Sequence, residues 1–250
     1  MFKKLKKNNF IIIIPARYNS KRLPGKPLIK IKGLSMILRT CIQCSKSVKK
    51  NKILVATDDM RIKKECEKEG FRSMITSKNC FTGTDRVYEI AKKTNYDHYI
   101  NVQGDEPVFN PKDLRKLLKS KNKFKKDVLL GFTKITNKKD IYNKAIPKIV
   151  FDRYYNLIYA SRSQIPFFHS TNKMTKFNYY RQVLAYCFPR KKLLKFGKIK
   201  KKSPLENSED IEILRFLELG IKVKLIKMSQ KSTSVDLPED INKINKLLSQ

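Results

Sequence analysis

The chain has 250 residues, and its 57 Lys and Arg against 22 Asp and Glu give a formal net charge of +35. This length fits one domain, or one domain with a small subdomain, and argues against two full domains. The longest uninterrupted apolar run is 10–14, which is too short to cross a bilayer and excludes a membrane-spanning helix.

The positive charge is spread along the chain and does not form one basic stripe. A charge of this size would ordinarily indicate a nucleic acid or an anionic surface as the partner. A genome composition biased toward Lys, Ile and Asn would produce the same excess, so the charge is weak evidence about function. We expect neither a nucleic acid nor a membrane as partner, and a basic nucleic-acid-binding protein is the alternative from another class.

The cysteines and histidines form no catalytic or metal-binding pattern. The cysteines, at positions 41, 44, 66, 80 and 187, make no closely spaced framework, and no secretory signal peptide is recognised, so a reducing cytoplasm is expected. Cys41 and Cys44 form a C-x-x-C pair with no second pair to complete a zinc site. His98 and His169 offer no triad spacing, which argues against a nucleophilic serine or cysteine mechanism.

In chain order, the first half alternates strands and helices. Ile11 to Ile14 is a wholly apolar, β-branched stretch, typical of a strand buried on both faces of a parallel sheet. The alternation predicts an α/β fold with a doubly wound, mixed but mostly parallel sheet. Strands are expected at 11–14, 52–57, 71–75, 99–102 and 128–135, and helices at about 36–46, 60–69, 83–93 and 111–120.

From Pro147 onward the pattern becomes β-rich. We expect an antiparallel hairpin from 148–152 and 157–160, a strand over 181–188, a helix over 208–219, a strand over 223–228 and a last helix from Pro238. One domain, 1–250, would then hold a core at about 1–146 and 200–250 and a small β-rich insertion at about 147–199.

A basic loop follows the first strand. Arg17, Lys21, Arg22 and Lys26 lie within ten residues, and three prolines hold the loop out of a helix. Ligands of open α/β sheets bind beyond the carboxyl ends of the strands, so this loop indicates an anionic ligand, and a polyphosphate would use several cations at once. The loop matches neither a Walker loop nor a dinucleotide-binding glycine turn. A solvated basic turn is the structural alternative.

Two carboxylates follow other strands. Asp105 comes directly after the strand at 99–102, and Asp236 lies between the strand at 223–228 and a helix that begins with proline. If both face the basic loop, they suggest a Mg²⁺-dependent reaction on phosphate, because oxygen ligands hold this hard cation. As structural alternatives, Asp105 is a turn former and Asp236 a helix cap.

The stretch Gly83 to Arg86 opens a helix after a long loop. Thr84 is the expected N-cap, and Asp85 suits the positive end of the helix dipole. Backbone donors at such a helix start can hold an anion or the edge of a nucleobase.

Seven motifs along the chain carry a family resemblance. They read IIPARYNSKRLPGKPL at 13–28, ILVATDD at 53–59, TGTDR at 82–86, NVQGDEP at 101–107, YASRSQIPF at 159–167, SPLE at 203–206 and VDLPED at 235–240. In these motifs and their order the chain resembles the CMP-Kdo synthetases, the 3-deoxy-manno-octulosonate cytidylyltransferases, over nearly its whole length.

This resemblance implies a cytoplasmic nucleotidyltransferase with a nucleotide-diphosphosugar transferase-like fold. Such an enzyme joins CTP to a 2-keto-3-deoxy acidic sugar, most simply Kdo, and releases pyrophosphate; its CMP-sugar serves lipopolysaccharide or capsule biosynthesis. The resemblance also implies that the core at about 1–146 and 200–250 binds the nucleotide, and that the β-rich insertion at about 147–199 serves sugar binding and the assembly of a homodimer. An enzyme fold that binds nucleotide without catalysis is a further alternative.

The resemblance implies roles for particular residues. CTP would be held by Arg17, Ser20, Arg22, Lys26, Gly83, Thr84 and Arg86, and Mg²⁺ by Asp105 and Asp236. The catalytic set would be Arg17, Arg22, Lys26, Asp105 and Asp236. The sugar would be bound by Gln103, Arg162, Gln182, Tyr186, Glu206 and Glu209, with a sheet-face aromatic as the alternative for Tyr186.

The chain departs from the family in its sugar-side motifs. Gln182 stands where the family usually has a substrate-contacting histidine, and Phe167 where it often has tryptophan. These changes leave the sugar open: 8-amino-Kdo or a nonulosonic acid of the sialic type is the alternative to Kdo.

Overall fold

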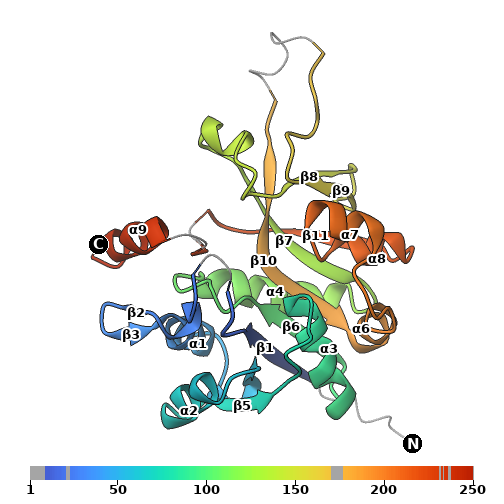
Figure 1. The fold of residues 1–250 in the computed structure, drawn as a ribbon. Coiled ribbons are helices and arrows are strands. Elements are labelled where there is room, and N and C mark those ends of the chain that lie inside the picture. The colour runs from blue at the N-terminus through green and yellow to red at the C-terminus, as the bar shows by residue number, and fades with distance from the viewer. Residues whose placement is uncertain are drawn as a thin grey trace, which may run out of the picture.

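The computed structural model describes residues 9–20, 23–169, 177–230, 232, 234–235 and 238–249. Its main feature is a sheet of nine strands (Figure 1). Seven of them follow the order β11-β7-β10-β6-β1-β4-β5, and β8 and β9 attach beside β10. The strands are β1 (Phe10–Ala16), β4 (Ile53–Thr57), β5 (Arg72–Ile75), β6 (His98–Val102), β7 (Val128–Lys134), β8 (Lys148–Phe151), β9 (Leu157–Ser161), β10 (Tyr180–Pro189) and β11 (Val223–Lys227).

Helices cover both faces of this sheet, and β2 and β3 form a separate small hairpin. The hairpin strands are β2 (Lys30–Ile31) and β3 (Leu34–Ser35). The helices are α1 (Met36–Ser45), α2 (Met60–Lys68), α3 (Gly83–Lys93), α4 (Pro111–Lys123), α6 (Arg190–Phe196), α7 (Pro204–Glu209), α8 (Leu214–Glu218) and α9 (Pro238–Leu247). Short 3-10 turns are η1 (Lys26–Leu28), η2 (Lys50–Lys52) and η3 (Lys138–Ile141).

The central strand β1 supplies two separate cores. Successive side chains of a strand point to opposite faces, so Ile11 and Ile13 pack on one side and Ile12 and Ile14 on the other. The first core includes apolar residues of α3, α6 and α8, and the second includes those of α1, α2 and α4. All four isoleucines are fully buried, as the sequence predicted for a parallel strand between two helix layers.

The predicted fold class is confirmed: β1, β4, β5 and β6 are parallel to one another, and β11 is parallel to β7. The main difference concerns β10, which the sequence placed in the β-rich insertion. This strand lies inside the main sheet, antiparallel to both β6 and β7. Its buried aromatic and apolar residues suit a central position, and strand order depends on contacts that sequence spacing does not reveal.

The single helix expected at 208–219 is two short helices, α7 and α8. Asp210 interrupts the helix with a left-handed backbone, φ 51° and ψ 45°. The Arg162 guanidinium donates hydrogen bonds to backbone carbonyls at this helix end. Its Nε donates to Glu209 O at 2.7 Å and its Nη2 to Asp210 O at 3.0 Å. The predicted hairpin from 148–152 and 157–160 is confirmed as β8 and β9.

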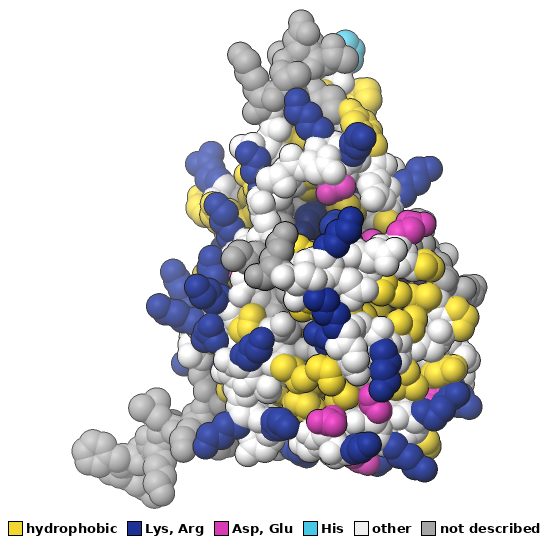
Figure 2. Space-filling view, turned by 90° about the vertical axis from the view of Figure 1, so that its left-hand side faces the viewer, with side chains coloured by type: hydrophobic (Ala, Val, Ile, Leu, Met, Phe, Trp, Pro, Cys, Tyr) yellow, Lys and Arg dark blue, Asp and Glu magenta, His cyan; other side chains and the backbone are white. Residues whose placement is uncertain are grey.

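Lys and Arg side chains are dispersed over the surface, and apolar patches lie between them on the face in Figure 2. None of the helices in the described part of the chain has the length and apolar character needed to cross a bilayer.

Candidate functional site

The candidate site lies where parallel strands β1, β4 and β6 end. The basic loop leaves β1 after Ala16, and the carboxylate-bearing loops leave β4 and β6 at the same edge of the sheet. Lys26 and Asp105, predicted from separate motifs, meet here: Lys26 Nζ lies 2.7 Å from Asp105 Oδ2. Gly25 begins the turn that carries Lys26 and adopts φ 68°, a conformation that favours glycine.

A close backbone approach fixes the position of Asp105. A Cβ on Gly104 would lie 2.7 Å from the carbonyl oxygen of Pro15, so only glycine lets the end of β6 approach the end of β1 this closely. The second carboxylate oxygen, Asp105 Oδ1, is buried and has no hydrogen-bond partner among the described residues. A buried acceptor without a donor is costly, which suits an atom that receives a cation or a ligand.

Asp236, the second predicted metal ligand, lies outside the described residues. Val235, which precedes it, donates its backbone N–H to Asp105 O at 3.0 Å. Within the described ranges, no group of three or more His, Cys, Asp or Glu side chains could hold a metal ion. Of the two expected Mg²⁺ ligands, the described residues therefore include only Asp105.

The other predicted phosphate contacts have different surroundings. Arg17 is exposed, and Ser20 is half-buried with its backbone N–H donating to Tyr18 O at 3.0 Å. Arg22 lies outside the described residues. The basic loop is held to β4 by Asp58, whose Oδ1 accepts the Tyr18 N–H at 3.1 Å.

The start of α3 was predicted correctly, but its N-cap is Thr82 and not Thr84. Thr82 Oγ1 accepts the Asp85 N–H at 3.2 Å, and Asp85 Oδ2 accepts the Thr82 N–H at 2.9 Å, which closes a capping box. Thr84 lies inside the helix, with its backbone N–H donating to Glu212 Oε2 at 2.9 Å. A Cβ on Gly83 would lie 2.5 Å from the Gln103 amide, so Gly83 packs directly on that side chain.

Arg86 is only 3% exposed, and it connects the loop after β4 with the loop after β5. Its guanidinium donates to Asp58 Oδ2 at 3.1 Å and to Thr76 Oγ1 at 2.5 Å. Arg86 thereby supports the basic loop through Asp58, and its predicted contact with CTP stays a prediction.

Acidic groups affect the pKa of Tyr186 on the first core face. Glu212 Oε1 accepts the Gln103 side-chain N–H at 3.1 Å, and burial raises the pKa of Glu212 although the bonds from Thr84 lower it. Burial, followed by the charges of Glu212, Glu106 and Asp105, raises the pKa of Tyr186 well above its usual value. Tyr186 is buried and stacks on Phe188, with ring centroids 5.6 Å apart, as the sheet-face alternative described.

Besides Gln103, which donates to Glu212, three of the predicted sugar contacts have protein partners in this structure. The Arg162 guanidinium donates to backbone carbonyls, including Lys144 O at 3.0 Å. Glu209 accepts from Ser161 Oγ at 2.7 Å and from the Arg162 N–H at 2.8 Å. Glu206 has no exposed surface and pairs with Arg215. Direct contact of a sugar with Glu206 is therefore not what this structure shows.

Gln182 and Gln103 remain the sugar-side candidates with polar capacity near the strand ends. Gln182 is 7% exposed, and its Oε1 has no hydrogen-bond partner among the described residues. Its position in β10 is opposite Phe132 of β7.

Sequence reasoning missed Asp58, Glu212 and Arg215. Asp58 carried a usable signal, because it directly follows the buried strand β4 at the carboxyl edge of the sheet. Glu212 and Arg215 gave none, since both fall within the single amphipathic helix expected at 208–219, and the pattern does not show which charges another element will bury.

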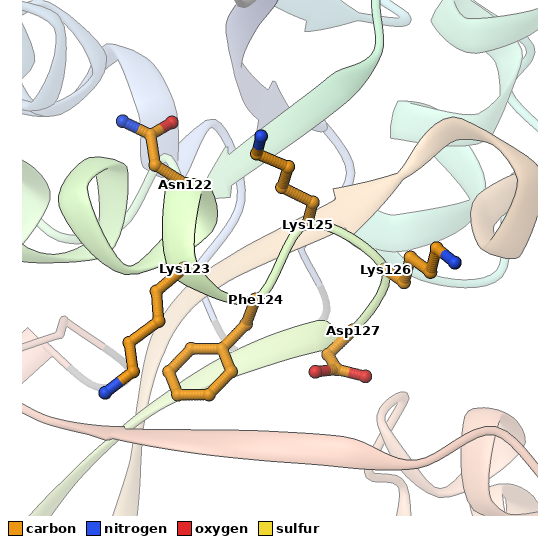
Figure 3. A pocket seen from close by; sticks show the side chains of 6 residues that line it. All are labelled: Asn122, Lys123, Phe124, Lys125, Lys126 and Asp127. Atoms are coloured by element: carbon orange, nitrogen blue, oxygen red, sulfur yellow. The ribbon is translucent and has the colours of Figure 1, made fainter.

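A shallow hollow of about 430 Å³ lies at the opposite edge of the sheet. It surrounds the loop between α4 and β7, which precedes β7 and therefore lies at the amino ends of the parallel strands (Figure 3). This hollow does not belong to the site at the carboxyl ends. Its lining residues are Asn122, Lys123, Phe124, Lys125, Lys126 and Asp127.

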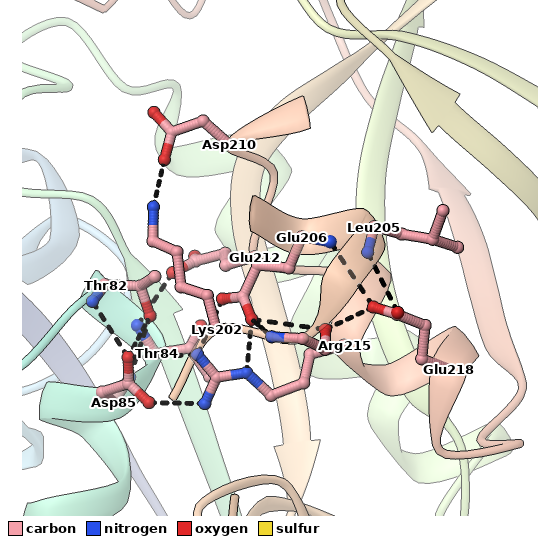
Figure 4. A network of polar contacts seen from close by, with 11 residues as sticks. Thr82, Thr84, Asp85, Lys202, Leu205, Glu206, Asp210, Glu212, Arg215 and Glu218 are labelled. Carbon is pink, nitrogen blue, oxygen red and sulfur yellow. Dashed lines mark hydrogen bonds and ion pairs between the residues drawn. The ribbon is translucent and has the colours of Figure 1, made fainter. Parts of the chain in front are cut away.

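A polar network connects the start of α3 with α7 and α8 beside the site (Figure 4). Arg215 stands at its centre between Asp85 and Glu206. Glu218 adds a second set of bonds, accepting the Leu205 N–H at 3.0 Å.

Comparison with known proteins agrees with this geometry. The family model described as Cytidylyltransferase matches residues 11–226. The chain is 37% identical over 239 residues to a 3-deoxy-manno-octulosonate cytidylyltransferase of Chlamydia pneumoniae, covering 94% of this chain and 92% of that protein. It is 38% identical over 249 residues to an 8-amino-3,8-dideoxy-manno-octulosonate cytidylyltransferase of Shewanella sp. (strain W3-18-1), covering 96% and 98%.

A solved structure gives the same answer. CMP:2-keto-3-deoxy-manno-octonic acid synthetase complexed with CTP aligns with a TM-score of 0.88 and 31% identity, covering 97% of this chain and 99% of that one. The resemblance found in the sequence motifs is confirmed. The chain belongs to the cytidylyltransferase family, in which it matches octulosonate cytidylyltransferases over nearly their whole length.

Proposed function

We propose that this protein is a CTP-dependent nucleotidyltransferase that activates a 2-keto-3-deoxy acidic sugar and releases pyrophosphate. The observation that carries the proposal is the meeting of Lys26 and Asp105 at the carboxyl edge of the sheet, within a chain of this family. A cation and a carboxylate from separate loops are what a nucleotide triphosphate and its metal require. The product, a CMP-sugar, would serve lipopolysaccharide or capsule biosynthesis.

The reaction is a displacement at the α-phosphorus. The anomeric hydroxyl oxygen of the sugar forms the new bond to phosphorus, the bond to the bridging oxygen breaks, and pyrophosphate leaves with that electron pair while the hydroxyl proton is released. Such a step needs alignment and charge neutralisation more than covalent help from the protein. The proposed triphosphate contacts are Arg17, Arg22 and Lys26; the proposal is supported by the exposure of Arg17 and by the position of Lys26 beside Asp105.

Mg²⁺ is the proposed cofactor, held by Asp105 and Asp236. The fit rests on Asp105 Oδ1, a buried oxygen without a donor among the described residues, and on the hydrogen bond from Val235 to the Asp105 carbonyl. Oxygen ligands suit this ion. When bound, it would neutralise phosphate charge and make the attacking hydroxyl more acidic.

The proposed sugar is Kdo or 8-amino-Kdo, because relatives named for each are equally similar to this chain. Gln103 and Gln182 supply amide groups that can bind hydroxyls. An α/β enzyme that acts on soluble nucleotides is expected in the cytoplasm.

A homodimer through the β-rich element is proposed from its exposed apolar side chains. Tyr154 is 66% exposed, Ile158 59% and Phe167 81%. Large apolar side chains clustered on one element indicate a surface that another copy covers. Light scattering of the purified protein checks this, and a monomer at micromolar concentration would contradict it.

The test is pyrophosphate release from the four nucleoside triphosphates with Kdo, 8-amino-Kdo and a sialic-type acid. We expect release with CTP and one of the octulosonates. Asp105→Asn should lower the rate by on the order of a hundredfold or more, because it removes a ligand charge beside the reacting phosphate. Asp97→Asn is the matched control, since Asp97 is exposed at the opposite end of β6 and should leave the rate unchanged. Unchanged turnover in Asp105→Asn would refute the metal role.

A further inference from the structure

Arg215 of α8 holds two carboxylates with one fully buried guanidinium. Its Nε and Nη2 donate to the two Glu206 oxygens at 2.6 and 2.7 Å. Its Nη1 and Nη2 donate to the two Asp85 oxygens at 2.7 and 3.3 Å (Figure 4). Two bidentate pairs on one side chain fix the direction as well as the distance of both partners.

Both partners are acids that close capping boxes. Asp85 occupies the third position of α3 and accepts the Thr82 N–H, and Glu206 does the same in α7 with Ser203. Arg215 therefore joins the N-termini of two helices that come from distant parts of the sequence. One guanidinium carries a single positive charge against two carboxylates, so the group has an excess of negative charge. The positive N-terminal ends of the two helices stabilise this charge.

The guanidinium also packs on Phe196 of α6, with its central carbon 3.9 Å from the ring centroid. Burial opposes its charge, but the hydrogen bonds to Glu206 and Asp85 outweigh that effect and raise the pKa of Arg215 above its usual value. Arg215 thus stays charged, and water does not compete for its partners.

We infer that Arg215 is a positioning residue that holds the start of α3, on the nucleotide side of the site, in a fixed position relative to the 206–212 segment on the sugar side. This role rests on the proposed function. Glu212 lies three residues before Arg215 and accepts from both Thr84 and Gln103, so the same connection fixes the polar groups between the two substrates. Groups held in this way align the attacking hydroxyl with the α-phosphorus, and small misplacements slow such reactions strongly.

A matched control for Arg215 lies at the C-terminal end of α3. Arg190 of α6 donates from Nη2 to Ala91 O at 3.2 Å, near the C-terminus of α3 and away from the site. This bond also ties α3 to a neighbour, but it leads to no substrate group. Arg190→Lys therefore measures the general cost of loosening α3.

The decisive variant is Arg215→Lys, which keeps the charge and cannot form two bidentate pairs. We expect kcat for pyrophosphate release to fall by about tenfold to a hundredfold, and the Kd for CTP alone, measured by calorimetry, to rise by a smaller factor than kcat falls. Arg190→Lys should leave kcat unchanged. In the Arg215→Lys variant, amide hydrogen exchange should become faster in the peptide that contains residues 82–86. In the Arg190→Lys variant, exchange in that peptide should stay as slow as in the unmodified protein.

A kcat for Arg215→Lys equal to that of the unmodified protein would overturn the inference. If the unmodified protein releases no pyrophosphate with any sugar, the proposed function fails. Hydrogen exchange then tests by itself whether Arg215 holds the start of α3, and unchanged exchange at 82–86 in Arg215→Lys would disprove this. Should Arg215→Lys not fold, Asp85→Asn breaks the same connection from α3 and is expected to give the same loss of kcat.

Discussion

At the scale of single residues, Glu212 is in conflict with its surroundings. Its half-buried carboxylate lies between Gln103, which follows β6, and the start of α3, where burial disfavours the charged form and raises its pKa. Two donors, Gln103 Nε2 and the Thr84 N–H, compensate only in part. A charged group kept in such a place costs stability, which is typical of residues retained for a ligand.

This conflict predicts a pH-dependent effect of Glu212→Gln. Because the folded pKa is raised above the unfolded value, the folded state binds more protons, and the free energy of unfolding decreases as pH rises from about 4.3 through the folded pKa. Glu212→Gln removes this loss, so it should stabilise the protein at pH 8 by on the order of 1 kcal/mol and have less effect at pH 4.

Urea unfolding at several pH values measures this difference. Glu69→Gln, an exchange of an exposed glutamate, is the control and should show no such trend. A stability difference for Glu212→Gln that does not grow with pH would contradict the conflict described for Glu212.

At the scale of elements, the start of α3 makes several contacts within a single turn. Its cap, Thr82, lies next to Gly83, which packs on Gln103, and Asp85 of the same turn is bound by Arg215. The Thr82 side chain is therefore expected to influence both helix stability and nucleotide binding.

Thr82→Ala should lower the free energy of unfolding by about 1 kcal/mol, because the Asp85 N–H loses its acceptor. It should also raise the KM for CTP, since the adjacent turn would be less ordered. Asn137→Ala is the control: Asn137 caps η3 by accepting the Lys139 N–H at 3.1 Å, and it lies in the loop after β7, on a different element from α3. A raised KM in Asn137→Ala, or an unchanged KM in Thr82→Ala, would contradict a specific role for the α3 cap.

At the scale of the whole molecule, the net charge of +35 repels itself. The positive side chains are spread over the surface and do not line one groove on the face in Figure 2. A charge distributed in this way destabilises the compact state without creating a specific binding site.

The melting temperature is therefore expected to rise by a few degrees between about 0.02 and 0.3 M NaCl, because salt screens repulsion over distances beyond about 10 Å. Replacing Lys123 and Lys126, both exposed at the loop between α4 and β7, by glutamate should make this rise smaller. A melting temperature that falls with salt would show that attractive ion pairs outweigh the repulsion.

The sequence alone determined the fold class, and it brought forward the residues that are proposed for the nucleotide side. Buried isoleucines alternating with amphipathic helices are local features, and the contacts they need arise wherever two helix layers cover a parallel sheet. Lys26 and Asp105 were found in the same way, because each lies in a loop that follows a buried strand and the carboxyl ends of parallel strands share one edge.

Only the tertiary structure decided how distant segments meet. The place of β10 between β6 and β7, the break at Asp210, and the joining of Asp85 to Glu206 by Arg215 all depend on partners far apart in the chain. Sequence periodicity reports which face of an element is apolar. It does not report which buried charge will face it from another element, and this pairing is what joins α3 to α7 and α8.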